Sequence, residues 1–381
     1  MKYIQVIAIA LVLFAIGCNN ANNNSDNTAT DSATTDSASG GSSVTSNEKL
    51  ETVFTDSTYQ FTGIAKEEGG RIFLTYPKWS PIYRYALVST NGDTGVTPYP
   101  TAVMNSWQTG QPGNNKWVCV QSMYIDDSGG HWVIDPAAPM LKNVQGKGAK
   151  LVKLDKTTGT VIKTYNITGT ITDTSYANDV RIDTKEGFAY ITDSKTGGII
   201  IVNLTTSALR EVLKGDKSTL SDPAYKFIID GRELMKEGKL AKFNSDGIAL
   251  SPDRSYLYYK PLTDDKLYRI KTEYLRNFSL ADTAFGNLVE DLGHFNTTDG
   301  MIFDKSGNLY MGDLQKYQIV KLDKNMKKSV LVQDSALIWP DTYAIADDYL
   351  YFTCSQINKQ PDYNAGVNKR TTPYKVYRIK L

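Results

Sequence analysis

The sequence has few of the residues on which metal sites and many hydrolases depend. It contains 3 cysteines and 2 histidines in 381 residues. Without a Cys-x-x-Cys pair, and with two histidines only, it gives little support to a zinc cluster, a His-rich metal site or a Ser-His-Asp hydrolase. An excess of one charge is lacking too, since 42 Lys and Arg balance 41 Asp and Glu to a net charge of +1. Such a chain offers no basic surface for nucleic acid or an anionic membrane.

The N-terminal hydrophobic run is too short to span a membrane. Residues 4–16 are apolar apart from Gln5, whereas a spanning helix needs about 20 such residues. A run of this length is typical of a secretory signal peptide. Residues 15–18, Ala-Ile-Gly-Cys, resemble a bacterial lipobox, in which the cysteine is lipidated and becomes the new N-terminus. We therefore expect a lipoprotein signal peptide at 1–17 and lipidation of Cys18; a plain secretory signal with an incidental cysteine is the alternative.

The next segment predicts a disordered tether at residues 18–46. After Cys18 it contains only Asn, Ser, Thr, Asp, Ala, Gly and one Val, which cannot bury enough apolar surface to offset chain ordering. A flexible chain of this length would hold the folded part on the order of 30 Å from a bilayer. We expect an exported, membrane-anchored cell-envelope lipoprotein, periplasmic or surface-facing, whose membrane contact is its lipid, with a monomeric folded domain at 47–381.

A unit of a short apolar strand, a turn with Gly or an acidic residue, and an aromatic strand recurs six times in that domain. The clearest copies, residues 246–259 and 299–310, align without gaps. Equivalent positions recur with a mean spacing of 56 residues, which is enough for four short strands. These six anchor positions are Phe61, Gln121, Asn178, Asp246, Asp299 and Asp341.

The repeat predicts an all-β, six-bladed β-propeller. Its sixth copy is one strand short, and an N-terminal strand at 50–54 can complete it and cover two sheet edges. Two packed β-sandwiches are the alternative, but they do not explain six equivalent turns. Two inserts interrupt the repeat. We expect residues 220–245, with a short helical pattern at 232–236, to overhang the face of the anchor positions, and residues 90–116 to form an extended surface loop.

The inner strands of a propeller line its channel, so residues at their equivalent starts converge. Asn178, Asp246, Asp299 and Asp341 would then form a ring of oxygen donors suited to Ca²⁺. Clustered carboxylates repel one another unless a cation, an amine or a proton lies between them. A capping role in turns is the structural alternative, and it is the reading favoured for Asp183, Asp253 and Asp304.

Aromatic residues accompany these anchor positions. Trp339 and Tyr343 flank Asp341, and Tyr176 lies near Asn178. Aromatic faces beside carboxylates suit an organic cation, although the same rings could simply pack between blades. His294 could reach the mouth of the channel; a loop histidine without a role is the alternative.

The two remaining cysteines are expected to be buried thiols. Cys119 and Cys354 both lie in apolar, strand-like runs, where free cysteine packs as a small hydrophobe. Export makes a disulfide between them the alternative.

Several longer runs resemble the major royal jelly protein and yellow family, and they occur in the family's order between about residues 61 and 357. They are residues 71–79, 98–100, 176–183, 189–194, 246–252 and 339–342. The resemblance implies a secreted propeller, here a bacterial member, that holds small molecules in its central funnel, biogenic amines in some cases. Bacterial members are often described as related to dopachrome tautomerase.

More distantly, the repeats resemble the calcium-dependent lactonases of the gluconolactonase and senescence-marker superfamily. That resemblance implies metal-binding roles for Asn178 and Asp299. Asp246 stands where those enzymes usually have Asn, and Phe61 where they have a glutamate. Three functions stay open. The first is a funnel that binds a small molecule, such as an amine, or a cation. The second is a Ca²⁺-dependent lactonase or dopachrome-tautomerase-like isomerase in which Asp299 or His294 moves a proton, and the third is an extracellular protein-binding scaffold.

Overall fold

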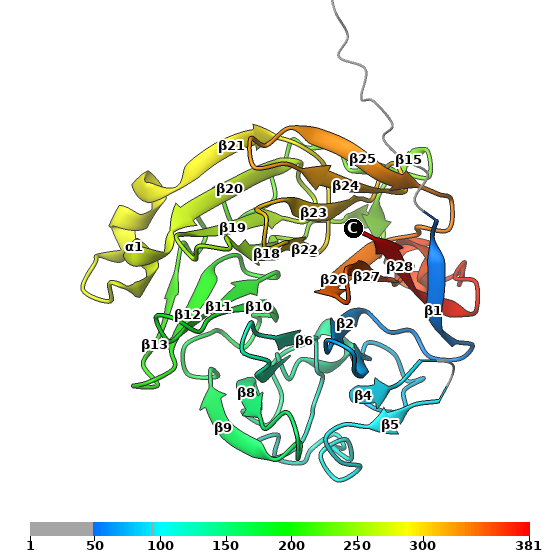
Figure 1. Ribbon diagram of the computed structural model, residues 1–381, viewed down its shortest axis with the longest axis horizontal. Coiled ribbons are helices and arrows are strands. Elements are labelled where there is room, and N and C mark those ends of the chain that lie inside the picture. The colour runs from blue at the N-terminus through cyan, green and yellow to red at the C-terminus, as the bar shows by residue number, and fades with distance from the viewer. Residues whose placement is uncertain (1–48, 93–94) are drawn as a thin grey trace, which may run out of the picture. The chain divides into compact units, whose positions relative to one another are not determined.

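Six four-stranded antiparallel sheets stand around a central axis in the computed structural model (Figure 1). The structure describes residues 49–92 and 95–381. The signal peptide predicted at 1–17, its lipidated Cys18 and the tether at 18–46 lie outside the described residues. The described chain is an all-β, six-bladed propeller, which confirms the fold that the repeat predicts.

Each of the first five blades begins with its inner strand, and the chain then moves outward one strand at a time. The first three blades are β2 (Gly63–Lys66), β3 (Ile72–Thr75), β4 (Leu87–Thr90) and β5 (Thr97–Pro98); β6 (Ser122–Ile125), β7 (His131–Asp135), β8 (Lys150–Leu154) and β9 (Val161–Asn166); and β10 (Ala177–Asp183), β11 (Phe188–Asp193), β12 (Ile199–Asn203) and β13 (Leu209–Val212). The next two are β18 (Ser245–Leu250), β19 (Tyr256–Pro261), β20 (Lys266–Lys271) and β21 (Glu290–His294); and β22 (Met301–Phe303), β23 (Leu309–Asp313), β24 (Gln318–Leu322) and β25 (Lys328–Gln333).

The sixth blade joins the two ends of the propeller. It consists of β26 (Pro340–Ala346), β27 (Tyr349–Cys354), β28 (Tyr374–Lys380) and, outermost, β1 (Glu51–Asp56). β1 pairs antiparallel with β28, and Arg378 Nε donates to Glu51 Oε2 at 2.8 Å. The N-terminal strand therefore closes the ring as predicted and covers an edge that would otherwise be open.

Both faces of a blade are buried because each blade lies between two others. In β12, Ile200 and Val202 pack against a cluster that includes Trp132 of the second blade. Ile199 and Ile201 point the other way, into a cluster with blade-four residues such as Tyr259. Alternate side chains of a strand point to opposite faces. The apolar run Ile-Ile-Ile-Val at residues 199–202 therefore packs the third blade against both of its neighbours.

The insert at 220–245 forms two short hairpins rather than a helix. β14 (Ile228–Ile229) pairs with β15 (Arg232–Glu233), and β16 (Met235–Lys236) pairs with β17 (Lys239–Leu240). The helical pattern predicted at 232–236 is wrong, because turn residues interrupt it. Asp230-Gly231 and Glu237-Gly238 all have positive φ, between 49° and 78°, and two such residues in succession form the tight turn that best fits a hairpin.

The insert at 90–116 is only partly a surface loop. It supplies β5, the outer strand of the first blade, and Trp107, which is 4% exposed in a core cluster. Asn105 holds the segment in place: its Oδ1 accepts from the amides of Ala86 and Leu87, and its Nδ2 donates to the carbonyl of Tyr99. The prediction of an extended loop missed these anchors because they depend on single side chains.

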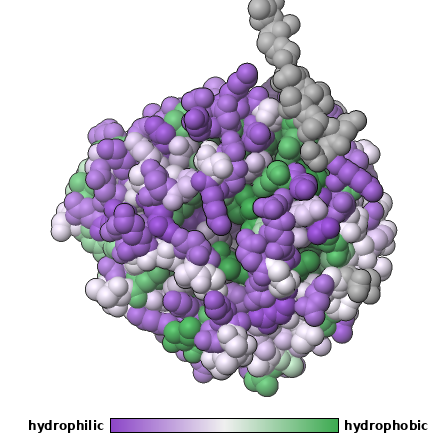
Figure 2. Space-filling view, viewed as in Figure 1, coloured by the Kyte–Doolittle hydropathy of each residue, from purple (hydrophilic) through white to green (hydrophobic). Residues whose placement is uncertain are grey.

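In the described part of the chain, helical structure is confined to short segments of three to seven residues. It comprises α1 (Thr272–Arg276) and the 3-10 turns η1 (Pro139–Leu141), η2 (Asp282–Leu288), η3 (Ile357–Lys359) and η4 (Pro361–Tyr363). Within residues 49–92 and 95–381, no helix has the length and apolarity required to cross a membrane. Figure 2 shows one face of the molecule, on which hydrophilic residues predominate and apolar residues gather in small patches.

Truncating Ile200 tests how strongly the packing between blades holds the ring. Ile200 is fully buried, so Ile200→Ala should lower the free energy of unfolding by about 2–5 kcal/mol through lost burial and a cavity. Ile162, which is 56% exposed in β9, is the control. Ile162→Ala should change the free energy of unfolding by less than about 0.5 kcal/mol. Urea denaturation of both variants measures the difference; equal effects would contradict this account of the core.

Candidate functional site

A cavity of about 320 Å³ opens at the end of the channel where the inner strands begin. Its deeper part is lined by five of the anchor positions: Gln121, Asn178, Asp246, Asp299 and Asp341. Residues of the 220–245 insert line it as well, which confirms that this insert overhangs the anchor face. The first anchor position, Phe61, is fully buried, and its ring centroid lies 5.8 Å from those of Phe54 and Tyr76. No glutamate of the lactonase kind stands in its place.

A repeated irregularity of the inner strands lies where the anchor residues are. The pairing register shifts between Ala177 and Val180 in β10, between Ser245 and Ile248 in β18, and between Pro340 and Tyr343 in β26. Such a bulge redirects side chains and is frequent near functional sites. Asn178, Asp246 and Asp341 each fall inside one of these shifts. The fold therefore repeats one local device to present the three residues at the channel mouth.

Glycines allow neighbouring inner strands to approach closely at the same level. A Cβ atom on Gly247 would lie 2.5 Å from the carbonyl oxygen of Asp299, and one on Gly300 would lie 2.5 Å from that of Asp341. The amide of Gly300 donates to the Asp341 carbonyl at 2.8 Å. The Asp-Gly pairs are therefore contacts between blades, and they bring Asp246, Asp299 and Asp341 together as a carboxylate cluster.

The hydrogen bonds of the carboxylate cluster leave one fully buried oxygen without a partner. Asn178 Nδ2 donates to Asp246 Oδ1 at 2.5 Å, and Trp339 Nε1 donates to Asp299 Oδ2 at 2.7 Å. Asp341 Oδ1 accepts from the hydroxyl of Thr342 at 3.1 Å. Asp341 is only 2% exposed, yet its Oδ2 is buried with no hydrogen-bond partner. A buried polar atom in this state is costly, which points to a missing donor.

Burial holds the carboxylate cluster close to its neutral form. Desolvation raises the pKa of Asp299 to about 7, against the lowering effect of its hydrogen bond from Trp339. The pKa values of Asp246 and Asp341 lie well above the usual range, because both are buried and both face the charge of Asp299. Asp179, buried beside them, also has a raised pKa through desolvation. The cluster can therefore exchange protons near neutral pH, or release them to admit a cation.

Aromatic side chains form part of the wall of the cavity. This aromatic wall consists of Trp79, Tyr176, Phe243, Trp339 and Tyr363. Trp79 Nε1 donates to the Tyr176 hydroxyl at 2.8 Å, which donates in turn to Gln121 Oε1 at 2.7 Å. These bonds fix the orientation of the rings before any ligand arrives.

Tyr343 does not line the cavity, so its prediction as a ligand contact is wrong. The register shift before Tyr343 breaks the alternation that would have placed it on the same side as Asp341. Its ring packs between blades in a cluster with Tyr310 and Phe352. The other predicted contacts, Tyr176, Asn178, Asp246, Asp299, Trp339 and Asp341, do line the cavity.

Several lining residues were not predicted as site residues. Gln121 was an anchor position, but its neutral side chain gave no chemical signal. Trp79 lies in a loop between strands, and Lys236 and Phe243 lie in the insert, whose path the sequence did not reveal. For Asp179 there was a signal: it adjoins Asn178 at the start of the third inner strand.

Neither histidine reaches the cavity. His294 ends β21, the outermost strand of its blade, and its Nδ1 lies 2.7 Å from Asp265 Oδ1; its predicted approach to the channel mouth is wrong. His131 is buried in β7, where its Nδ1 shares a hydrogen bond with the Tyr99 hydroxyl and burial lowers its pKa. Acid–base chemistry in the cavity would therefore fall to the carboxylate cluster.

The predicted capping role of three turn residues and the predicted burial of two thiols are confirmed. Asp183, Asp253 and Asp304 cap turns by accepting hydrogen bonds from backbone amides two to four residues away, such as the amide of Ser306 to Asp304. Cys119 and Cys354 are buried and free. The disulfide alternative is therefore excluded.

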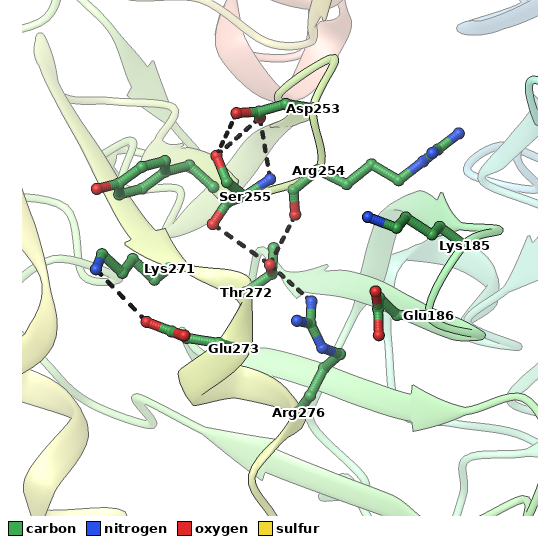
Figure 3. A pocket seen from close by; sticks show the side chains of 10 residues that line it. Lys185, Glu186, Asp253, Arg254, Ser255, Lys271, Thr272, Glu273 and Arg276 are labelled. Atoms are coloured by element: carbon green, nitrogen blue, oxygen red, sulfur yellow. Dashed lines mark hydrogen bonds and ion pairs between the residues drawn. The ribbon is translucent and has the colours of Figure 1, made fainter.

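A second cavity, of about 310 Å³, lies at the opposite end of the inner strands, between the third and fourth blades (Figure 3). Its arginines are already paired. Arg276 lies 3.5 Å from the buried carboxylate of Asp183 and donates to Thr272, and Arg254 pairs with Asp127. These contacts connect α1 with turns of neighbouring blades. The cavity therefore has a structural role at the boundary between blades.

The carboxylate cluster fits a calcium ion poorly. Among the residues that the structure describes, no three His, Cys, Asp or Glu side chains are grouped so as to hold a metal ion. Donors from Asn178 and Trp339 already occupy oxygens that calcium would need. The calcium site at Asn178, Asp246, Asp299 and Asp341 stays a prediction.

Fold and cavity together define a closed six-bladed propeller with an acidic, partly aromatic funnel. The chain matches the family described as Major royal jelly protein over residues 118–380, from just before β6 to the end of β28. This match covers more than half of the chain, and the chain belongs to that family. The resemblance in the sequence began earlier, near residue 61.

Individual relatives are distant. Protein yellow of Drosophila melanogaster is 24% identical over 238 residues, which cover 58% of this chain and 43% of that protein. Major royal jelly protein 1 of Apis mellifera is 24% identical over 210 residues, which cover 51% of this chain and 46% of that protein. The chain spans less than half the length of these relatives. A solved gluconolactonase from Xanthomonas campestris has a TM-score of 0.52 at 12% identity, over 88% of this chain and 90% of that one, and shares the fold.

The raised pKa of Asp299 predicts how stability varies with pH. The free carboxyl titrates near 4 and the folded one at about 7, so between these pH values the native protein holds more protons than the unfolded chain. The free energy of unfolding should therefore fall as pH rises through this window. Asp299→Asn keeps an acceptor for Trp339 and removes the charge, so its stability should fall less. Urea denaturation from pH 4 to 8 measures both slopes; identical slopes would contradict the assignment.

Proposed function

We propose that the chain binds a small organic cation, such as a primary amine, in its funnel. The observation that carries the proposal is the unpartnered Oδ2 of Asp341, which is buried beside two further carboxyls and belongs to a residue that lines the cavity. An ammonium group supplies both the missing hydrogen-bond donor and the missing positive charge. Charge-assisted bonds of this kind are stronger than neutral ones.

The aromatic wall favours an organic cation over a bare ion. Indole and phenol faces attract ammonium groups through their electron-rich faces, and they cover the apolar body of an amine. A volume of about 320 Å³ suits a molecule of small-ligand size. Family membership adds support, because the resemblance in the sequence implies a propeller that holds small molecules in this place.

Asp341→Asn tests the proposal directly. Removing the charge should lower the affinity for benzylamine at least about tenfold, since bonds to charged groups contribute about 1.5–3 kcal/mol. Asp348→Asn is the control, because Asp348 is exposed and distant from the cavity lining. Isothermal calorimetry measures both variants. Absence of saturable binding of benzylamine and other amines to the folded wild type would refute the proposal, and a calcium-dependent rise in Tm that Asp299→Asn abolishes would favour calcium instead.

A second candidate is an isomerase or lactonase. It is favoured by Asp299, whose pKa of about 7 allows it to take and return a proton near neutral pH. Turnover of an aminochrome or a lactone that Asp299→Asn abolishes would support this candidate. Turnover that is absent, or indifferent to that substitution, rules it out.

We also propose that the protein is exported and anchored through a lipid on Cys18. The support is the lipobox-like run at 15–18 and the short hydrophobic run before it. Metabolic labelling with a radioactive fatty acid in a bacterial host should label the wild type and not Cys18→Ser. Cys119→Ser, which removes a buried thiol, should keep the label; an unlabelled wild type would contradict the anchor.

A further inference from the structure

Lys236 is a cation without a partner at the mouth of the cavity. It lies on β16 of the overhanging insert, and its side chain lines the cavity. Its Nζ sits over the rings of Phe243 and Tyr363, at 5.5 and 5.6 Å from their centroids. Within the described ranges it makes neither a hydrogen bond nor an ion pair, although it is partly buried.

The charges around Lys236 do not neutralise it. Asp362 and Glu237 are the nearest carboxylates and favour its charged form, but neither forms an ion pair with it, and Lys195 opposes them. Burial outweighs the carboxylates and lowers the pKa of Lys236. The two aromatic rings hold the ammonium group in place without satisfying its donors.

The other lysines of the cavity are held by the backbone. Lys195 Nζ donates to the carbonyl of Leu141, and Lys242 Nζ donates to those of Asp222 and Tyr225. Both line the same cavity as Lys236. The cavity therefore has two poles: the carboxylate cluster at its inner end and, on the side of the insert and loops, three lysines against the single carboxylate of Glu237.

We propose that the ligand of this cavity is zwitterionic, with its ammonium group at Asp341 and a carboxylate or similar anion at Lys236. The inference rests on the proposed function, since it takes the same amine site and adds the opposite pole. Each end of such a ligand satisfies one unpartnered group, Asp341 Oδ2 and Lys236 Nζ. The aromatic wall suits an apolar or aromatic body.

Two pairs of probes that differ by one carboxylate test the second pole. The pairs are benzylamine with 4-(aminomethyl)benzoate, whose charges lie at opposite ends of a ring, and phenethylamine with phenylalanine, whose charges are adjacent. At pH 7.5, the carboxylate member of at least one pair should bind the wild type about tenfold more tightly than its amine partner. Lys236→Met should remove this advantage and leave the affinity for the simple amine unchanged or higher, because a repulsive charge is gone.

The control is Lys239→Met in the same insert. Lys239 lies on β17, is exposed and does not line the cavity, so this variant should bind all four probes as the wild type does. If both carboxylate probes bind no better than their amines, or if Lys236→Met weakens amine and carboxylate probes equally, the zwitterion inference is wrong while the amine site stands. If none of the four probes binds, the proposed function fails and the inference falls with it.

Discussion

The approach of three carboxyl groups at one end of the channel is the constraint on which the rest of this structure depends. Asp246, Asp299 and Asp341 are each buried, and together they cannot all carry charge without a compensating cation or proton. Their proximity follows from the ring, because Gly247 and Gly300 let adjacent inner strands nearly touch. Burial and mutual repulsion favour the protonated form of this cluster when it is empty, and they prepare it for a cation.

The rest of the propeller supplies the rigidity. Apolar strands packed on both faces bind each blade to its neighbours, and β1 paired with β28 prevents the ring from opening. Bulges at the same level of three inner strands then turn selected side chains into the channel. The loops and the insert above the mouth add aromatic rings and lysines to the cavity lining.

The sequence was sufficient to predict the fold and the core of the site, because both follow from regular spacing. The repeat located all six blades and five anchor residues that line the cavity, and the incomplete sixth copy implied the closing strand. Features that depend on one local conformation were missed. The bulge that turns the Tyr343 side chain away from the cavity cannot be recognised from the residue types of the strand. The position of Lys236 depends on two hairpin turns that a helical pattern obscured, and His294 was misplaced because its strand is outermost.

Proton release on ligand binding tests the central claim most directly. If the carboxylate cluster is protonated when empty and charged when an amine is bound, binding at pH 6.5 must release protons to the buffer. Calorimetry with benzylamine in two buffers of different ionisation enthalpy measures that number. The account predicts net release of a proton that is diminished in Asp299→Asn. Binding with the same enthalpy in both buffers would contradict it, since the carboxyls would then already be charged or would not contact the ligand.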